Sequence, residues 1–140
     1  MKKLILALVV ILFSTNTLFA KQIKWTKIVT TEDRTTEFYL DKKSIRKVGE
    51  FHYFWMMSDY LILEEGDNPD TKSSITFNII NCKTNELKRV TMTTFTLNNV
   101  KGKISSDFIV PDLGMDLFQW RFYSEETAFG MVFKEVCKVK

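Results

Sequence analysis

The stretch WRFYSEETAFGMVFKEVC, residues 120–137, decides the fold that we expect for this chain. Between Thr127 and Val136 the apolar residues recur at helical spacing, and a projection at about 100° per residue places them within one half of a helix. Cys137 falls on the same half, and Ser124 or Thr127 can cap the first turn. The stretch therefore predicts a C-terminal helix whose apolar face carries a cysteine.

The second cysteine, Cys82, ends a run of alternating, strand-like residues. Two cysteines in an exported chain most simply form one disulfide. A bond from Cys82 to Cys137 closes a loop of about 56 residues, which the chain-entropy model values at about 4 kcal/mol. Two free thiols, one of them a nucleophile, would instead need a reducing compartment or an activating base. We expect the disulfide, which would fix the helix to a sheet.

Residues 1–20 have the form of a secretory signal peptide. Lys2 and Lys3 precede an apolar run from Leu4 to Phe13, and a polar segment then leads to Ala20. A membrane anchor is the alternative, but the run is about half as long as the ~20 residues that a spanning helix needs. We expect cleavage near Lys21, a single domain over residues 21–140, no transmembrane segment after cleavage, and a periplasmic, cell-surface or secreted location.

The balance of charge argues against a nucleic-acid partner. The chain of 140 residues has a formal net charge of +3, from 20 Lys and Arg against 17 Asp and Glu. Two of those lysines lie in the signal, so the mature chain is close to neutral, and its charges of both signs are mixed along the sequence.

Strand-like alternation recurs along the mature chain and is broken by turn formers. Between Asp41 and Gly49 the sequence is short and charged, which favours a single helical turn. Asn85 suits a tight hairpin turn. The expected fold class is α+β, an antiparallel sheet of five or six strands in a meander, with one C-terminal helix disulfide-bonded to it. The expected strands are Ile23 to Thr31, Thr36 to Leu40, Phe51 to Ile62, Ser73 to Cys82, Leu87 to Leu97 and Ile104 to Ile109.

The strand from Phe51 to Ile62 is apolar on both faces, which indicates a central position. One helix cannot cover both sides of such a sheet, so aromatic surface is left for a partner unless sheet curvature and the linker from Val110 to Phe118 bury it. Which face is exposed does not follow from the sequence, because a slip of one residue exchanges the two. The candidate partner-binding residues are His52, Phe54, Met56 and Tyr60, with basic Lys43 and Arg46; Tyr53, Trp55 and Met57 form the other face.

No constellation of catalytic or ligating residues stands out. His52 is the single histidine and has no second ligand at metal or triad spacing. The acidic loop from Glu64 to Asp70 lacks the spacing of an EF-hand. The five glycines form no phosphate-binding loop. We therefore expect a protein that is not an enzyme and that carries no cofactor and no metal.

Several short motifs follow one another along the mature chain: Trp25, Phe38-Tyr39, Asp41 to Gly49, Trp55, Asp59-Tyr60, Asn81-Cys82, Leu87-Lys88-Arg89, Trp120 and Val136-Cys137. Their order resembles that of the surface-adhesin protein E-like family of small exported bacterial domains. The departures, such as Asp41-Lys42 in place of the family's Asp-Pro, lie at turns and caps. The resemblance implies the same sheet and helix, surface exposure, and binding of extracellular matrix proteins.

The functional expectation is an exported, non-enzymatic binding module, adhesin-like, that contacts a protein or envelope component. The alternative is a periplasmic carrier that holds a small ligand in an aromatic pocket, and a hydrolase is a third reading. A homodimer that hides the aromatic surface is also open.

Overall fold

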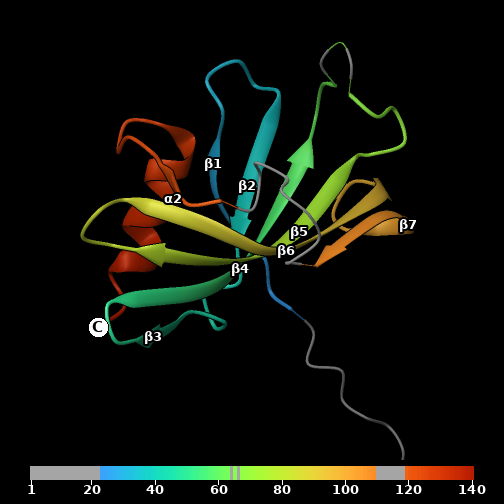
Figure 1. Ribbon diagram of the computed structural model, residues 1–140. Coiled ribbons are helices and arrows are strands. Elements are labelled where there is room, and N and C mark those ends of the chain that lie inside the picture. The colour runs from blue at the N-terminus through green and yellow to red at the C-terminus, as the bar shows by residue number, and fades with distance from the viewer. Residues whose placement is uncertain (1–22, 64, 66, 110–118) are drawn as a thin grey trace, which may run out of the picture.

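The computed structural model describes residues 23–63, 65, 67–109 and 119–140 (Figure 1). The expected signal peptide, its cleavage site and the whole linker from Val110 to Phe118 lie outside these residues. Among the described residues, no helix is long and apolar enough to cross a membrane.

The described chain forms one antiparallel sheet and one helix, in the expected α+β class. Six strands make the main path in the order β1-β2-β4-β5-β6-β7, while β3 pairs with β4 and β8 pairs with β6. The sheet thus has two short strands beyond the expected meander. The elements are β1 (Thr26–Thr30), β2 (Thr36–Leu40), β3 (Arg46–Val48), β4 (Phe51–Tyr60), β5 (Ser73–Asn81), β6 (Glu86–Leu97), β7 (Lys101–Ile109), β8 (Arg121–Phe122) and α2 (Ala128–Cys137).

Strand β4 is central, as its apolar pattern predicts. β5 pairs with it from Phe51 to Asp59, whereas the other edge is shared by two short strands. β2 pairs with the half that ends at Tyr60, and β3 pairs with the half that begins at Phe51. Two strands that follow one another in sequence therefore flank successive halves of the same partner.

The helical turn expected between Asp41 and Gly49 is wrong for its second half. The amide of Ser44 donates to the carbonyl oxygen of Asp41 at 2.9 Å, which closes one turn, and Arg46–Val48 then continues as a strand. Gly49 has a φ of 61°, which a glycine adopts without steric cost, and it turns the chain into β4. Pairing with β4 overrides the weak helical preference of three charged or branched residues.

Helix α2 begins where the sequence indicates. The side chain of Thr127 caps it by accepting a hydrogen bond from the amide of Gly130 at 3.1 Å. In Figure 1 the helix (red) lies beside β1 and β2 and away from β7 (orange), and its contacts are with β1, β2 and β4. The stripe predicted from the sequence faces the sheet, because Val132, Phe133 and Val136 are buried.

The core lies between α2 and one face of the sheet. Phe38, Leu40, Phe54, Ile80 and Leu87 meet the buried residues of the helix there. The Cys82–Cys137 disulfide joins the end of β5 to the end of α2, with the two Cα atoms 5.9 Å apart. The expected disulfide is confirmed, and it closes the core at one end.

Candidate binding surface

The register of β4 assigns its two apolar faces. His52, Phe54 and Met56 are 5%, 0% and 1% exposed, because they share the face of Ile80 that meets the helix. A partner cannot reach these three side chains in the folded protein. Their expected place on a binding face is therefore wrong. On the opposite face of β4, Met57 is also buried, at 1% exposed, whereas Phe51, Tyr53 and Trp55 are half-buried.

The opposite side of the sheet, which we call the outer face, carries a band of aromatic rings defined by Phe51, Tyr53, Trp55, Phe77 and Trp120. The first four are half-buried and Trp120 is 42% exposed. The ring of Phe77 lies 5.0 Å from Trp55 and 6.3 Å from Tyr53, and that of Trp120 lies 5.7 Å from Phe51, measured between centroids. Rings packed on one another lose little rotamer freedom on binding, which suits an interface.

Hydrogen bonds at the seam between β2 and β3 hold Trp55. Its backbone amide donates to the Ser44 Oγ atom at 3.0 Å, and its carbonyl oxygen accepts a hydrogen bond from the amide of Asp41. The turn that joins the two short strands is thereby fastened to the middle of the aromatic band. The indole is placed by rigid strand backbone, not by a free loop.

The far end of the outer face is closed by the turn between β6 and β7. Asn99 and Val100 have φ values of 57° and 51°, which are rare for residues with a side chain. Their amides donate to the Asp59 carboxylate at 2.6 Å and to the Ser73 Oγ atom at 3.0 Å. Asp59 is consequently only 3% exposed, and burial raises the pKa of its carboxyl group. The accessible aromatic band is thus limited to the half of β4 near β3.

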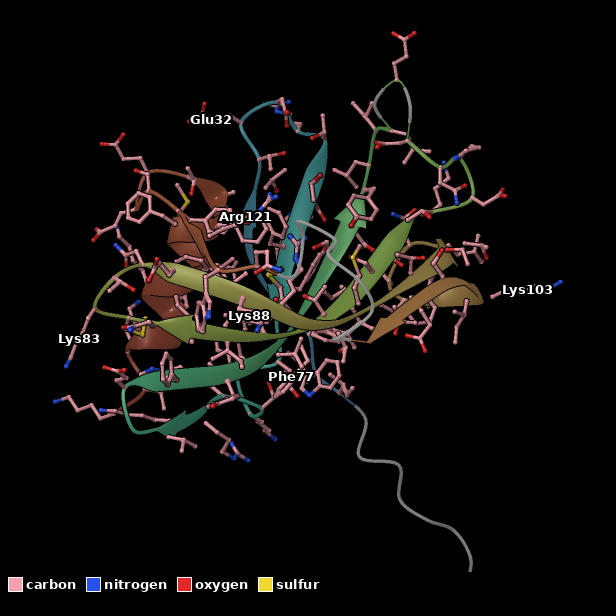
Figure 2. All side chains as sticks on the ribbon, viewed as in Figure 1. Glu32, Phe77, Lys83, Lys88, Lys103 and Arg121 are labelled. Carbon is pink, nitrogen blue, oxygen red and sulfur yellow. A yellow bond between two sulfur atoms is a disulfide. The ribbon has the colours of Figure 1, made fainter. Side chains whose placement is uncertain are left out.

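Two cations lie in one row of the outer face. Arg46 on β3 pairs with Tyr53, Tyr53 pairs with Ile79 on β5, and Ile79 pairs with Lys88 on β6. Residues paired across an antiparallel sheet point to the same side, so this row has a cation at each end and apolar groups between them. Phe77 and Lys88 are labelled near the middle of the sheet in Figure 2.

These two cations differ from four lysines of the described chain that form ion pairs with glutamates. Arg46 and Lys88 form no ion pair with any residue of the described chain. By contrast, the lysine side chains of four other positions each lie within ion-pair distance of a glutamate: Lys27, Lys42, Lys134 and Lys138. Lys43, the other basic candidate, is exposed in the turn before β3. The structure therefore brings Arg46 beside the outer face, and sequence reasoning missed Lys88.

Tyr60 lies elsewhere, at the rim of a hollow of about 410 Å³ between β4, β6 and the loop that follows β4. Its hydroxyl is 2.9 Å from the Ser74 Oγ atom. Met92 and Thr94 line the floor, and Asp67 and Asn68 lie on the loop side. Tyr60 is the one aromatic residue among the described lining residues, so the hollow differs from the aromatic pocket expected of a carrier.

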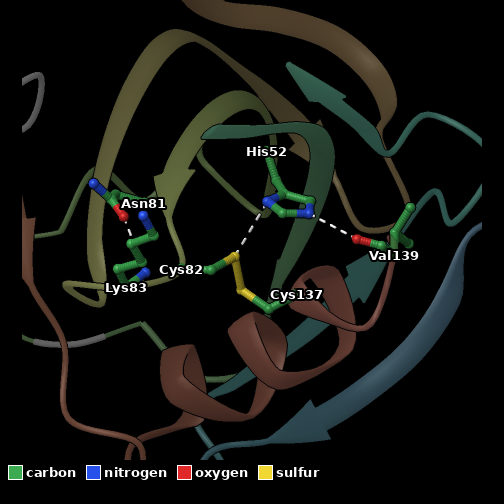
Figure 3. The surroundings of a disulfide bond; sticks show 6 residues. All are labelled: His52, Asn81, Cys82, Lys83, Cys137 and Val139. Atoms are coloured by element: carbon green, nitrogen blue, oxygen red, sulfur yellow. Dashed lines mark hydrogen bonds between the residues drawn. A yellow bond between two sulfur atoms is a disulfide. The ribbon is translucent and has the colours of Figure 1, made fainter. Parts of the chain in front are cut away.

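His52 has a structural environment (Figure 3). Its Nε2 atom lies 2.8 Å from the carbonyl oxygen of Val139, and its Nδ1 atom lies 3.2 Å from the Sγ atom of Cys82. Within the described residues, no group of three or more His, Cys, Asp or Glu side chains is placed to hold a metal ion. The histidine connects the disulfide to the chain just beyond α2.

This architecture is similar to that of known proteins. A family model described as Surface-adhesin protein E matches residues 25–138. The structure of Haemophilus influenzae protein E aligns with a TM-score of 0.55 and 13% sequence identity, over 81% of this chain and 83% of that one. Its crystal form II aligns with a TM-score of 0.53 and 13% identity, over 79% and 86%. No curated protein matches significantly. At this identity the two solved structures share the fold with the present chain.

Proposed function

The chain belongs to the surface-adhesin protein E family, and from that premise we propose that it is an exported, adhesin-like binding module without enzymatic activity. Its partner is a protein or another envelope component, and an extracellular matrix protein is the candidate that the family name suggests. In this proposal residues 1–20 form the signal peptide and residues 21–140 form the mature binding domain.

The observation that supports this proposal most directly is the aromatic band of the outer face. Tyrosine, tryptophan and phenylalanine are enriched at the centres of protein interfaces, where they bury large areas at low entropic cost. Tyr53 and Trp55 lie on a central strand, so a partner meets a rigid surface. Among the described residues, α2 covers only the inner side of the sheet, so this band is the part of β4 that they leave accessible to a partner.

The test is capture of envelope and matrix proteins by the mature chain, with chemical cross-linking and surface plasmon resonance as readouts. The variant Tyr53→Ser/Trp55→Ser should lose capture and keep its cooperative unfolding. Met131→Ser is the matched control, since Met131 is an exposed apolar residue on α2 and is 45% exposed. Equal capture by both variants would contradict the assignment of the outer face.

Export has its own measurement. The intact mass of the protein recovered from the cell envelope should correspond to a chain that begins near Lys21. Recovery of the full chain with residues 1–20 in the membrane fraction would contradict cleavage.

The hollow beside Tyr60 favours a second candidate function, a carrier of a small ligand. Its volume of about 410 Å³ lies within the usual range of ligand sites. Native mass spectrometry of the purified protein would show a bound small molecule if this function holds, and the Tyr53→Ser/Trp55→Ser variant would retain that molecule. Sedimentation of the same samples would show whether a homodimer covers the outer face.

A further inference from the structure

We propose that the outer face binds an acidic glycan, a carbohydrate chain that carries carboxylate or sulfate groups. This inference rests on the proposed function, because it assigns a chemical class of partner to the same face. Its basis is the combination of partly exposed rings with two cations that have no ion-pair partner among the described residues.

The rings supply one half of the recognition. The two faces of a pyranose ring present C–H groups, which pack on the electron-rich face of an aromatic ring. Tyr53, Phe77 and Trp55 are half-exposed neighbours in contact, and Trp120 extends the surface beside Phe51. The rings are held by strand backbone at the surface, so a sugar chain can lie along them without entering a cavity.

The cations supply the other half. Arg46 and Lys88 end the row that contains Tyr53 and Ile79, three strand spacings apart, so their backbones are separated by about 14 Å. A chain of a few sugars that stacks on Tyr53 therefore reaches a positive charge on each side. Anionic groups at two positions along the chain would satisfy both, whereas a neutral glycan would leave the two charges unused.

The hydrogen bonds of Arg46 prepare it for this role. Its Nη1 atom donates to the carbonyl oxygens of Lys43 at 2.7 Å and of Ile45 at 2.8 Å. These bonds orient the guanidinium group, while its Nε and Nη2 atoms have no partner among the described residues. A fixed guanidinium with free N–H groups favours a carboxylate or sulfate, which can accept two parallel hydrogen bonds.

Acidic groups near the band do not cancel these charges. Glu86 lies on the outer face in the row of Phe51, where its carboxylate accepts a hydrogen bond from the Thr84 hydroxyl at 2.8 Å. It is one row away from the cations. An exported protein meets polysaccharides outside the cytoplasm, which favours the glycan over a single-stranded nucleic acid.

The experiment measures binding of the mature chain to four polymers by isothermal titration calorimetry and by affinity electrophoresis. Chondroitin sulfate and polygalacturonate are the acidic glycans, dextran is the neutral glycan, and an oligothymidylate is the nucleic acid. We expect both acidic glycans to bind, dextran not to bind, and the affinity to fall as salt is added.

Matched variants locate the site. Arg46→Gln/Lys88→Gln should weaken binding of the acidic glycans by at least ~10-fold, because two charge-assisted contacts are lost. The control Lys101→Gln/Lys103→Gln removes the same charge from β7, at the far end of the sheet, where Lys103 is labelled in Figure 2, and it should bind like the wild type. Arg46→Lys/Lys88→Arg keeps both charges and should retain part of the affinity.

Three results would overturn the inference. The first is failure of the wild type to bind either acidic glycan at low salt. The second is a loss of affinity in the β7 control as large as in the outer-face variant. The third is tighter binding of the oligothymidylate than of the acidic glycans, with the same dependence on Arg46 and Lys88. Capture of a protein partner that depends on Tyr53 and Trp55, in the absence of glycan binding, would leave the proposed function standing and reject this inference alone.

Discussion

The Nδ1 atom of His52 lies 3.2 Å from the Sγ atom of Cys82, so the one histidine of the chain touches its one disulfide. Its other ring nitrogen, Nε2, faces the carbonyl oxygen of Val139, which can only accept. Nε2 therefore carries the proton. In the neutral ring the bare Nδ1 atom then faces a sulfur that has no hydrogen to donate.

Replacing His52 by leucine should loosen the segment after α2. The variant His52→Leu loses the donor to Val139, which we expect to cost about 1 kcal/mol of unfolding free energy. Hydrogen exchange of the last residues should quicken, and urea unfolding gives the energy. His52→Gln, which keeps an N–H donor, is the control; the same loss in both variants would show that ring packing and not the hydrogen bond matters.

Removing the disulfide should have a larger effect. The double variant Cys82→Ser/Cys137→Ser opens a loop with a sequence separation of 55, and the chain-entropy model predicts a loss of about 4 kcal/mol. Urea unfolding of oxidised wild type and variant measures it. Alkylation of the native oxidised protein should label neither thiol, and labelling of both would refute the bond.

The two faces of β4 should respond differently to truncation. Phe54 is fully buried, so Phe54→Ala should cost about 3–5 kcal/mol through the lost transfer energy and the cavity. Tyr53→Ala removes a half-exposed ring on the neighbouring position and should cost about 1 kcal/mol. Thermal and urea unfolding of the two variants compare them directly. Equal losses would mean that the outer face is also core.

Gly130→Ala should destabilise the protein even though alanine is the better helix former. A Cβ atom at this position would lie 2.3 Å from the carbonyl oxygen of Ser124 and 2.5 Å from the Cα atom of Glu125. The capping segment would have to move away, at a cost of about 1–3 kcal/mol. Differential scanning calorimetry measures this loss. In the same experiment, the variant Met131→Ala, at the exposed neighbouring position, should have nearly the unfolding free energy of the wild type. A stabilised Gly130→Ala variant would contradict the close approach.

Asp59 should make stability depend on pH in an unusual direction. Its carboxyl pKa is raised in the folded state, mainly by burial. The folded protein then binds more protons than the unfolded chain, and stability falls as pH rises from the ordinary carboxyl pKa through the raised folded value. Asp59→Asn keeps an acceptor for the Asn99 amide and removes the charge, so it should be more stable than wild type at neutral pH and similar in acid. Urea unfolding across pH checks this, and an unchanged difference at all pH values would contradict it.

Most of the fold can be predicted from local patterns in the sequence. The helix and the Cys82–Cys137 pairing follow from periodicity and cysteine number, and capping chemistry narrowed the cap to Ser124 or Thr127, of which the structure uses Thr127. The short strands β3 and β8 do not follow, because Arg46–Val48 and Arg121–Phe122 are too short for a pattern. They are strands only because a longer strand offers them an unpaired edge.

The exposed face of β4 could not be predicted from the sequence, because it depends on the pairing register between β4 and β5. Cys82 must face the helix, and Ile80 and Asn78 share its side of β5. To find which residues of β4 lie on that side, one must know that His52 pairs with Ile80. The sequence does not fix this register, because the connection over residues 61–72 is long. The candidate residues on the inner face were chosen without that register, and the same gap hid Lys88, whose partner Ile79 places it on the outer face.

The position of α2 sets an order for folding. Apart from β2, which pairs with β4 across the short β3, the strands of the main path pair with their neighbours in sequence, so their contacts are short in range and cost little loop-closure entropy. The helix instead returns to β1 and β2, about a hundred residues earlier in the chain. In terms of contact order, the meander can form first and the docking of α2 is the slow, long-range step. Until that step is complete, the inner face of β4, which carries Phe54 and Met56, stays open to water and to any chaperone that meets the chain.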